Sequence, residues 1–394
     1  MYFRAPHYSN GLPPLRGHVR SLDGLRGFAA LLIVFHHSFI WPMLFAKGIT
    51  SPGAFHRTYG SDMLPLALWY GYSGVDLFFL LSGFCLLYPV FSRPEAPYSV
   101  RRYAWHRVRR IYPPYLVSLL AAICLAAVAY SRINAHLHSA TEPVRLRSVL
   151  TALTLTESHF CAPFWSLVVE AQWYFVVPIL ALLWKRSRWA MHGAALCLVV
   201  LLQLLSTAMP ALRLQPIAMY LPMFWIGIVF AEIATCWSGA RTFLARRGWL
   251  ALLLAGTLAV CLYAPAPSVW HLSRAQSYPF AIFYAGLLAA ALFTDGGRRI
   301  FSSDWMVKAG SFSYSLYLIH ALVIYVAIVL LDHFKIAGTR ELVLCLTVLP
   351  AACIGAGYLF YLAVEKRIQV PKRAPRKQRA QSEVAPPVFT AATA

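Results

Sequence analysis

The sequence predicts an all-α, polytopic membrane protein, a bundle of about ten transmembrane helices with no soluble domain. Hydrophobic residues make up 59% of the 394 residues and charged residues only 12%, and the mean hydropathy is +0.60. A soluble domain carries about twice that charged fraction. Long apolar runs and an alternating distribution of basic residues point to the same class.

Apolar runs divide the chain into ten candidate spans. Most of them are long enough to cross a hydrocarbon core of about 30 Å, whereas the seventh and eighth are short. The spans are 27–46, 72–90, 113–130, 166–184, 190–208, 217–235, 249–263, 279–294, 311–331 and 342–363. We therefore expect a membrane domain over 21–365, a short segment 1–20 before it, and a disordered basic tail over 366–394.

The basic residues predict the orientation of the bundle. The six segments on one side carry 26 of the 35 Lys and Arg residues: 1–26, 91–112, 185–189, 236–248, 295–310 and 364–394. This bias predicts that both termini are cytoplasmic. The net charge of +21 then reflects topology and attraction to anionic lipid, and we expect no nucleic-acid partner.

Arg26 and His37 are the first candidate site residues. They are eleven residues apart, about three helical turns plus 20°, so they share one stripe of a helix. His37 then lies roughly 16 Å along the helix from Arg26, near mid-membrane, where an ionisable side chain is usually functional. Its neighbour His36 points about 80° away from Arg26 and is the weaker candidate.

An arginine cluster forms the second candidate site. Five arginines lie within residues 101–110, and Arg107 and Arg110 share a helix face if the segment is helical. Such a pair suits a phosphate or a carboxylate. Basic clusters beside a span also set topology and bind lipid head groups, which is the alternative interpretation. Pro113 and Pro114 suit the start of the next helix.

Two acidic residues lie within apolar spans. Glu170 is the only acid of its span and is placed about 6–9 Å from the external end, and Asp76 has a similar position in the second span. A buried carboxylate pairs, takes up a proton or faces a cavity. Two roles are open for each residue, direct catalysis and an interhelical hydrogen bond. The two are about equally supported for Glu170, whereas the hydrogen bond is favoured for Asp76.

Two further residues are candidates for supporting roles. Asp23 precedes Arg26 by three positions and is expected to pair with it. His320 lies mid-span, where it is either a structural hydrogen-bonding residue or part of the same cavity as His37. The eight cysteines show no metal-ligand spacing, and we expect no metal site.

Five ordered blocks resemble the acyltransferase-3 family of integral membrane acyltransferases, typified by O-antigen acetylases. The resemblance extends over nearly all of 20–365. The blocks are Leu22-Asp-Gly-Leu-Arg-Gly27 with His37, Gly74-Val-Asp-Leu-Phe-Phe79 with Ser82-Gly-Phe84, Arg107-x-x-Arg110-Ile-x-Pro113, Trp165-Ser-Leu-x-x-Glu170, and Ser313-Tyr-Ser-Leu-Tyr-Leu-x-His320. Many family members have a second Glu after the position of Glu170, whereas this chain has Ala171.

The resemblance implies transfer of an acyl group, usually acetyl, from cytoplasmic acyl-CoA to a hydroxyl. The expected acceptor is a carbohydrate, a glycolipid or a secondary metabolite, and the expected location is the bacterial inner membrane. The family's essential Arg and His pair corresponds to Arg26 and His37, and its Arg-x-x-Arg pair to Arg107 and Arg110. Acyl-CoA would be a donor substrate, with no permanently bound cofactor.

These residues predict a mechanism at the centre of the membrane. His37 would act as general base, and Arg26, Arg107 and Arg110 would hold the phosphates of acyl-CoA at the cytoplasmic entrance. Glu170 would orient the acceptor hydroxyl or pair with His37. The alternative is a proton-coupled secondary transporter that uses Glu170, Asp76 and His37 as a proton relay.

Overall fold

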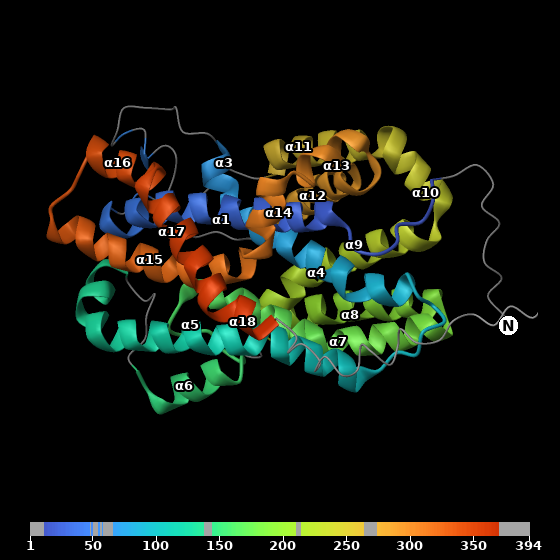
Figure 1. The fold of residues 1–394 in the computed structure, drawn as a ribbon, viewed down its shortest axis with the longest axis horizontal. Coiled ribbons are helices and arrows are strands. Elements are labelled where there is room, and N and C mark those ends of the chain that lie inside the picture. Colours follow the sequence, from blue (N-terminus) through green and yellow to red (C-terminus); the bar gives the residue numbers. More distant parts are fainter. Residues whose placement is uncertain are drawn as a thin grey trace, which may run out of the picture.

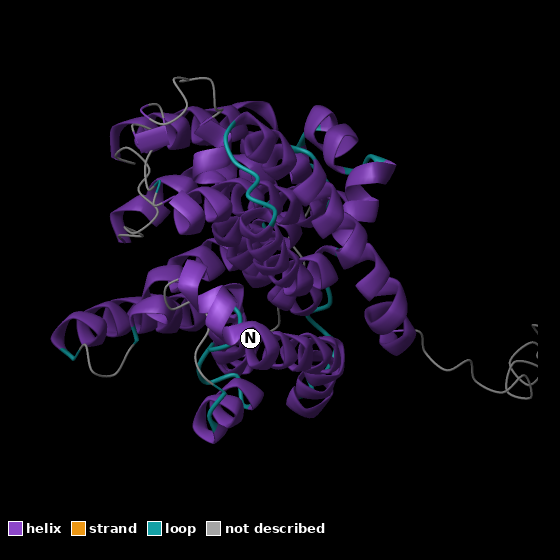
Figure 2. Ribbon diagram, turned by 90° about the vertical axis from the view of Figure 1, so that its left-hand side faces the viewer, coloured by secondary structure: helices purple, strands orange, loops and turns teal. Residues whose placement is uncertain are grey.

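The computed structural model describes residues 12–47, 49, 54–55, 57, 66–137, 144–209, 214–263 and 274–369. Every regular element within these residues is a helix, which confirms the all-α class (Figure 2). Nine of the described helices are long and apolar enough to cross a membrane, and a bent pair would make ten. The polytopic membrane class is therefore confirmed. Most of the predicted terminal segments, 1–11 and 370–394, lie outside the described residues.

The long helices run along the molecule's long axis, with α5 and α6 on one side and α11, α12 and α13 on the other (Figure 1). The α-helices are α1 (Arg20–Lys47), α3 (Leu66–Trp69), α4 (Gly74–Phe91), α5 (Val100–Leu137), α6 (Leu146–Leu153), α7 (Trp165–Arg186), α8 (Arg188–Ala208), α9 (Gln215–Cys236), α10 (Ser238–Phe243), α11 (Trp249–Tyr263), α12 (Arg274–Phe293), α13 (Asp295–Phe301), α14 (Asp304–Ser311), α15 (Ser313–His333), α16 (Thr339–Leu346), α17 (Val348–Phe360) and α18 (Lys366–Gln369). Short 3₁₀ segments are η1 (Tyr70–Ser73) and η2 (Ala162–Phe164), and π segments are η4 (Leu244–Gly248) and η5 (Tyr361–Glu365).

Helix α5 differs from the sequence prediction. Pro113 and Pro114 were expected to begin a helix, but they lie inside one continuous helix that already contains the arginine cluster. Prolines inside a membrane helix are tolerated where neighbouring groups satisfy the backbone. These two prolines lack the N–H groups that would bond the carbonyls of Arg109 and Arg110. Next to this site, the carbonyl of Ile111 accepts a hydrogen bond from the Tyr314 hydroxyl at 2.9 Å, which attaches α5 to α15. The arginines are therefore held on a rigid helix that continues into the bundle.

The bent pair consists of α12 and α13, which meet at 95°. The bend occurs at Thr294, whose extended backbone ends α12. Its hydroxyl caps α13 by accepting the backbone N–H of Gly297 at 3.0 Å, which satisfies one of the donors at the start of that helix. The predicted span 279–294 therefore ends in a sharp turn into a helix with two arginines, Arg298 and Arg299.

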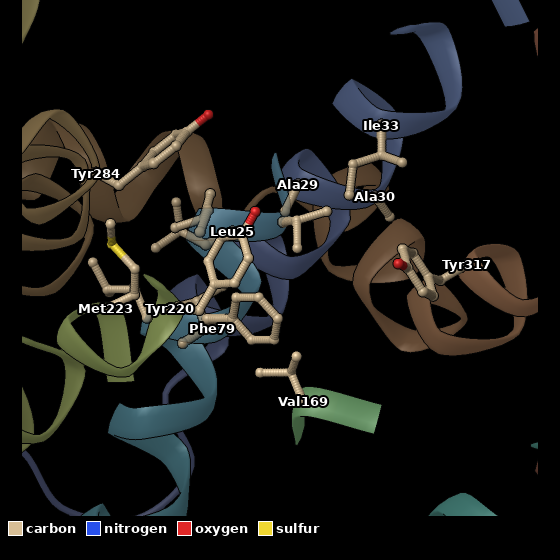
Figure 3. Close-up of a cluster of buried hydrophobic side chains, with 14 of the residues drawn as sticks. Leu25, Ala29, Ala30, Ile33, Phe79, Val169, Tyr220, Met223, Tyr284 and Tyr317 are labelled. Carbon is tan, nitrogen blue, oxygen red and sulfur yellow. The ribbon is translucent and has the colours of Figure 1, made fainter. Parts of the chain in front are cut away.

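Helix α1 is the central element of the bundle. It contacts α4, α5, α12, α13, α14, α15, α16 and α17. Its buried face includes Leu25, Ala29 and Ile33, which meet aromatic and aliphatic side chains of α4, α7, α9, α12 and α15 (Figure 3). Because the Arg26 and His37 side chains project from this enclosed helix, both are surrounded mainly by protein.

Helices α4 and α9 cross at two reciprocal glycines. A Cβ atom on Gly83 would lie 2.0 Å from the Phe224 carbonyl oxygen, and one on Gly227 would lie 2.0 Å from the Leu80 carbonyl oxygen. Small residues at such crossings let helix backbones approach closely, and close packing is a main source of helix association in membranes. This crossing fixes the position of Ser82 and Cys85 of α4.

We predict that Gly83→Ala destabilises the protein, whereas Gly193→Ala does not. Both changes exchange glycine for alanine within a helix, but a Cβ atom at Gly193 on α8 meets no atom within 4 Å. The loss at Gly83 should be about 1–3 kcal/mol because the crossing must separate. Thermal denaturation in detergent measures the difference, and equal midpoints for the two variants would contradict the proposed packing.

Candidate functional site

A large open cavity lies at one end of the bundle. Its volume is about 810 Å³, and we call it the arginine cavity. Arg26 of α1 and Arg107 and Arg110 of α5 line it. Residues of the N-terminal segment before α1 and Glu365 of η5 also line it, so the two ends of the described chain meet at this cavity.

A second, smaller cavity continues the first into the bundle. It has a volume of about 100 Å³, and we call it the inner cavity. The two cavities share Arg26, Cys85, Arg107 and Arg110, so the guanidinium groups lie at their junction. The inner cavity extends along Ser82, Glu170 and Tyr174 and reaches Tyr317.

The packing of α1 and α5 fixes the three arginines. A Cβ atom on Gly24 would lie 1.7 Å from the Phe301 carbonyl oxygen, so this glycine lets α1 approach α13 two residues before Arg26. Arg26 lies 3.8 Å from Asp23, the pairing that the three-residue spacing predicts. The Arg107 guanidinium faces the rings of Tyr103 at 5.7 Å and Tyr174 at 5.9 Å, which holds it by cation–π contact.

The arginine cavity carries an excess of positive charge. Within the described part of the chain, Arg107 and Arg110 have no acidic partner within ion-pair distance, and the Arg107 Nε atom is buried without a hydrogen-bond partner. Asp23 also contacts His18, at 2.8 Å. A guanidinium group presents donors in a fixed fork that matches phosphate and carboxylate. The cavity is therefore suited to an anionic ligand.

Tyr98, just before α5, lines a third cavity of about 280 Å³, which shares Arg107 with the arginine cavity. Burial raises the pKa of Tyr98 to about 12, so its hydroxyl stays protonated at neutral pH. This hydroxyl is buried and has no hydrogen-bond partner, as is the hydroxyl of the neighbouring Tyr103. The two rings are 6.2 Å apart. Within the described residues, the third cavity thus has two neutral hydroxyl groups without hydrogen-bond partners.

Glu170 belongs to the inner cavity. Its carboxylate accepts hydrogen bonds from the Ser82 hydroxyl at 2.8 Å and the Tyr174 hydroxyl at 2.6 Å. The expectation that Glu170 pairs with His37 is therefore wrong for this structure. The reason is that Glu170 faces α4 and the arginine-lined cavity, whereas His37 faces α15.

His37 lies in a separate cluster of rings. Its Nδ1 is 2.9 Å from Nε2 of His320, and its ring stacks on Trp41 at 4.2 Å. His36 makes a different contact, with its Nδ1 2.6 Å from the Leu68 carbonyl oxygen of α3. His320 thus contacts His37 directly. The sequence had left open whether His320 is a structural hydrogen-bonding residue or lies with His37. His37 lines neither of the two cavities described above.

Two aromatic side chains separate the inner cavity from the histidines. Phe78 and Tyr317 both line that cavity, and their rings are 6.0 Å apart. On its other side the Tyr317 ring lies 5.6 Å from the His320 ring. The Tyr317 hydroxyl is held at 2.7 Å from the Ser166 hydroxyl and donates to the Pro163 carbonyl at 2.8 Å. The predicted direct opening from the arginines to His37 is therefore closed in this conformation.

Asp76 makes no hydrogen bond to a described residue, whereas the sequence predicted an interhelical one. It is 3% exposed, and its Oδ1 atom is buried without a hydrogen-bond partner. The nearby Tyr284 hydroxyl is instead paired with Ser73 at 2.7 Å. Asp76 lines neither the arginine cavity nor the inner cavity.

Comparison with known proteins identifies the family. A family model described as an acyltransferase domain, of the acyltransferase-3 type, matches residues 19–363. The chain belongs to this family. Acyltransferase MdmB of Streptomyces mycarofaciens is 26% identical over 79% of the chain and 81% of its own length. Nodulation protein 10 of Rhizobium leguminosarum bv. viciae is 25% identical over 79% of the chain and 84% of its own length.

A viral relative matches a smaller part of the chain than these two proteins do. ORF330 of Acidianus two-tailed virus is 26% identical over 67% of the chain, and the match spans 64% of the viral protein's length. No solved structure matches. The family match over residues 19–363 contains Arg26, His37, Arg107, Arg110, Glu170 and His320, and family membership makes this chain a membrane acyltransferase.

Several residues of this acyltransferase site were not singled out from the sequence. Tyr174 follows Glu170 by four positions and therefore shares its helix face, a signal that was available. Tyr103 precedes Arg107 by four positions on α5, so the same spacing predicts their contact. Ser82 and Tyr317 reach the site through the packing of α4 and α15, which no spacing within one helix predicts.

We predict that Arg107→Ala weakens the binding of inorganic pyrophosphate about tenfold, because one charge-assisted hydrogen bond is worth about 1.5–3 kcal/mol. Arg299→Ala is the matched control, since Arg299 is exposed on α13 and lines neither cavity. Calorimetric titration of the purified protein measures both affinities. An equal loss in the two variants would show that net charge, and not the arginine cavity, binds the anion.

Proposed function

We propose that this acyltransferase moves an acyl group, normally acetyl, from cytoplasmic acyl-CoA to a hydroxyl of a carbohydrate, a glycolipid or a similar acceptor. The observation that carries the proposal is the arginine cavity, which is lined by four arginines, Arg109 among them, and by only two carboxylates, Asp23 and Glu365. Phosphate groups of the donor complement this charge. The family membership supplies the reaction class.

The sidedness of the cavity supports a cytoplasmic donor. Most of its lining residues come from segments 1–26, 91–112, 295–310 and 364–394, which are four of the basic connections. Basic connections remain on the cytoplasmic side of a membrane protein. We therefore place the entrance of the arginine cavity, and both termini, in the cytoplasm of a bacterial cell whose inner membrane holds the protein.

The cavities suggest a path for an extended donor molecule. The phosphates would lie among the arginines, and the pantetheine arm would enter the inner cavity past Cys85 and Ser82. Glu170, which already orders the Ser82 and Tyr174 hydroxyls, would arrange these donors around the arm. Acyl-CoA is a substrate in this scheme and leaves as CoA.

His37 is proposed as the general base. An alcohol loses its proton as it attacks a thioester, and an imidazole is suited to accept a proton near neutral pH. The thioester must then pass between Phe78 and Tyr317 to reach His37. Donor binding is therefore expected to move these two rings, and the acceptor is expected to approach His37 from the other side of them.

The transporter alternative is less well supported. It requires a continuous proton relay through Glu170, Asp76 and His37, but these three residues occupy three separate clusters in the described structure. Family membership also favours acyl transfer. Incubation of the purified protein with radiolabelled acetyl-CoA separates the two functions, because only the enzyme releases CoA.

We predict that His37→Ala lowers the rate of acetyl-CoA turnover by about 10²–10⁴-fold, the range for loss of a general base. The measurement is release of labelled acetate, with water as acceptor, by the protein in lipid nanodiscs. Acetyl-CoA affinity should change little, because the arginine cavity is intact. His333→Ala, at the exposed end of α15, is the control and should turn over normally. Full turnover by a folded His37→Ala protein would reject the base assignment.

A further inference from the structure

His37 and His320 form an in-plane hydrogen bond between two imidazole rings. The two rings are inclined by only 3°, their centroids are 5.2 Å apart, and the nitrogen atoms are 2.9 Å apart. A hydrogen bond to an imidazole nitrogen lies in the ring plane, so this arrangement is close to ideal. One of the two nitrogen atoms must carry the shared proton, and the neighbouring groups determine which.

The backbone of α15 defines the tautomer of His320. Its Nδ1 lies 2.8 Å from the Tyr317 carbonyl oxygen and 3.2 Å from the Leu316 carbonyl oxygen. Carbonyl oxygens only accept hydrogen bonds, so Nδ1 of His320 carries a proton. In a neutral ring, the second nitrogen, Nε2, then has a lone pair.

His320 is neutral on physical grounds. Its side chain is fully enclosed, with 0% exposure, and no acidic side chain of the described residues lies within ion-pair distance of it. A buried cation without an acidic partner is strongly unfavourable, above all inside a membrane. Nε2 of His320 is therefore an acceptor, and Nδ1 of His37 must be the donor.

His37 is left with one free lone pair. Because Nδ1 donates to His320, a neutral His37 has its lone pair on Nε2. Nε2 makes no hydrogen bond to a described residue and is not among the buried unpartnered atoms. His37 also keeps part of its surface accessible, whereas the stacked Trp41 covers one ring face. The structure therefore selects one nitrogen for proton transfer.

We propose that His320 is a positioning residue that fixes His37 in the tautomer whose Nε2 accepts the proton of the acceptor hydroxyl. This inference rests on the proposed acyl transfer. The acceptor oxygen forms a bond to the thioester carbonyl carbon, its proton passes to His37 Nε2, and the carbon–sulfur bond breaks. The leaving CoA thiolate then takes the proton from Nε2, which restores neutral His37.

His320 would act in the proton transfer through its acceptor nitrogen. When His37 takes the proton it becomes a cation, and the Nδ1–H bond to His320 becomes charge-assisted and therefore stronger. The role resembles that of the group that orients a catalytic histidine in hydrolases, with a neutral imidazole instead of a carboxylate. A backbone-anchored imidazole supplies orientation without placing a negative charge mid-membrane.

Solid-state NMR of the ¹⁵N-histidine-labelled protein in nanodiscs tests the tautomer directly. We expect a protonated Nδ1 and an unprotonated Nε2 at His37, assigned by difference from His37→Gln. In His320→Leu the fixed tautomer should be replaced by a mixture. Protonation of His37 at Nε2 in the unchanged protein would overturn the inference, whatever the protein's activity.

Two conservative variants test the positioning role. In His320→Gln the side-chain oxygen can occupy the place of Nε2, whereas in His320→Asn the amide reaches only the place of Nδ1. We expect His320→Gln to keep acetyl-CoA turnover within about threefold, and His320→Asn to lose about tenfold or more in kcat with KM for acetyl-CoA unchanged. Equal kcat for the two variants, both folded, would overturn the positioning role.

The two experiments distinguish the inference from the function on which it rests. If the tautomer is as expected but folded His37→Ala turns over normally, the base assignment fails and the hydrogen-bond assignment stands. If His37→Ala is inactive while Nε2 carries the proton, the proposed function stands and the role of His320 fails.

Discussion

The arrangement of this acyltransferase depends on three guanidinium groups that are held together with too little negative charge nearby. Arg26 has Asp23 at 3.8 Å, and Arg107 has aromatic faces in place of a carboxylate. Like charges in a partly enclosed site repel, so the fold must impose their proximity through packing. The close contact of Gly24 with Phe301 and the continuous helix α5 provide that constraint. An anionic donor would reduce this repulsion between the guanidinium groups. Its negative charge would therefore contribute favourably to the binding free energy.

Helix α1 separates charge binding from proton transfer by distance. Arg26 and His37 lie on one stripe about 16 Å apart, and the Phe78 and Tyr317 rings lie between the two regions. A guanidinium next to His37 would oppose the imidazolium that forms during proton transfer. In the proposed function, the separation would favour both phosphate binding and proton transfer, since the arginines would hold phosphates while the imidazole stays away from their charge. The same geometry matches an extended donor whose charged and reactive ends are far apart.

The sequence predicted the features that depend on one helix and failed where helices meet. The helical class, the spans and the Asp23–Arg26 contact followed from hydropathy and spacing. The meeting of Arg26 with Arg107 and Arg110 followed from their common position at basic span ends. By contrast, Pro113 and Pro114 indicated a helix start, but they lie inside α5. Pairing with His37 was one of the two roles predicted for Glu170, but its position along a span does not give the direction in which the side chain faces.

The Phe78 and Tyr317 rings form the barrier between the inner cavity and the histidine pair, and Tyr317 is held at two separate points. Tyr317 is bound through its hydroxyl to Ser166 and the Pro163 carbonyl, at the start of α7, and through its backbone carbonyl to His320. A donor arm that displaces the Tyr317 ring must break the hydroxyl contacts, while the carbonyl that anchors His320 belongs to α15 and can remain in place. The barrier can therefore open without disturbing the histidine tautomer. Under the proposed function, this independence would let the barrier open for a donor while His37 stays prepared as the base.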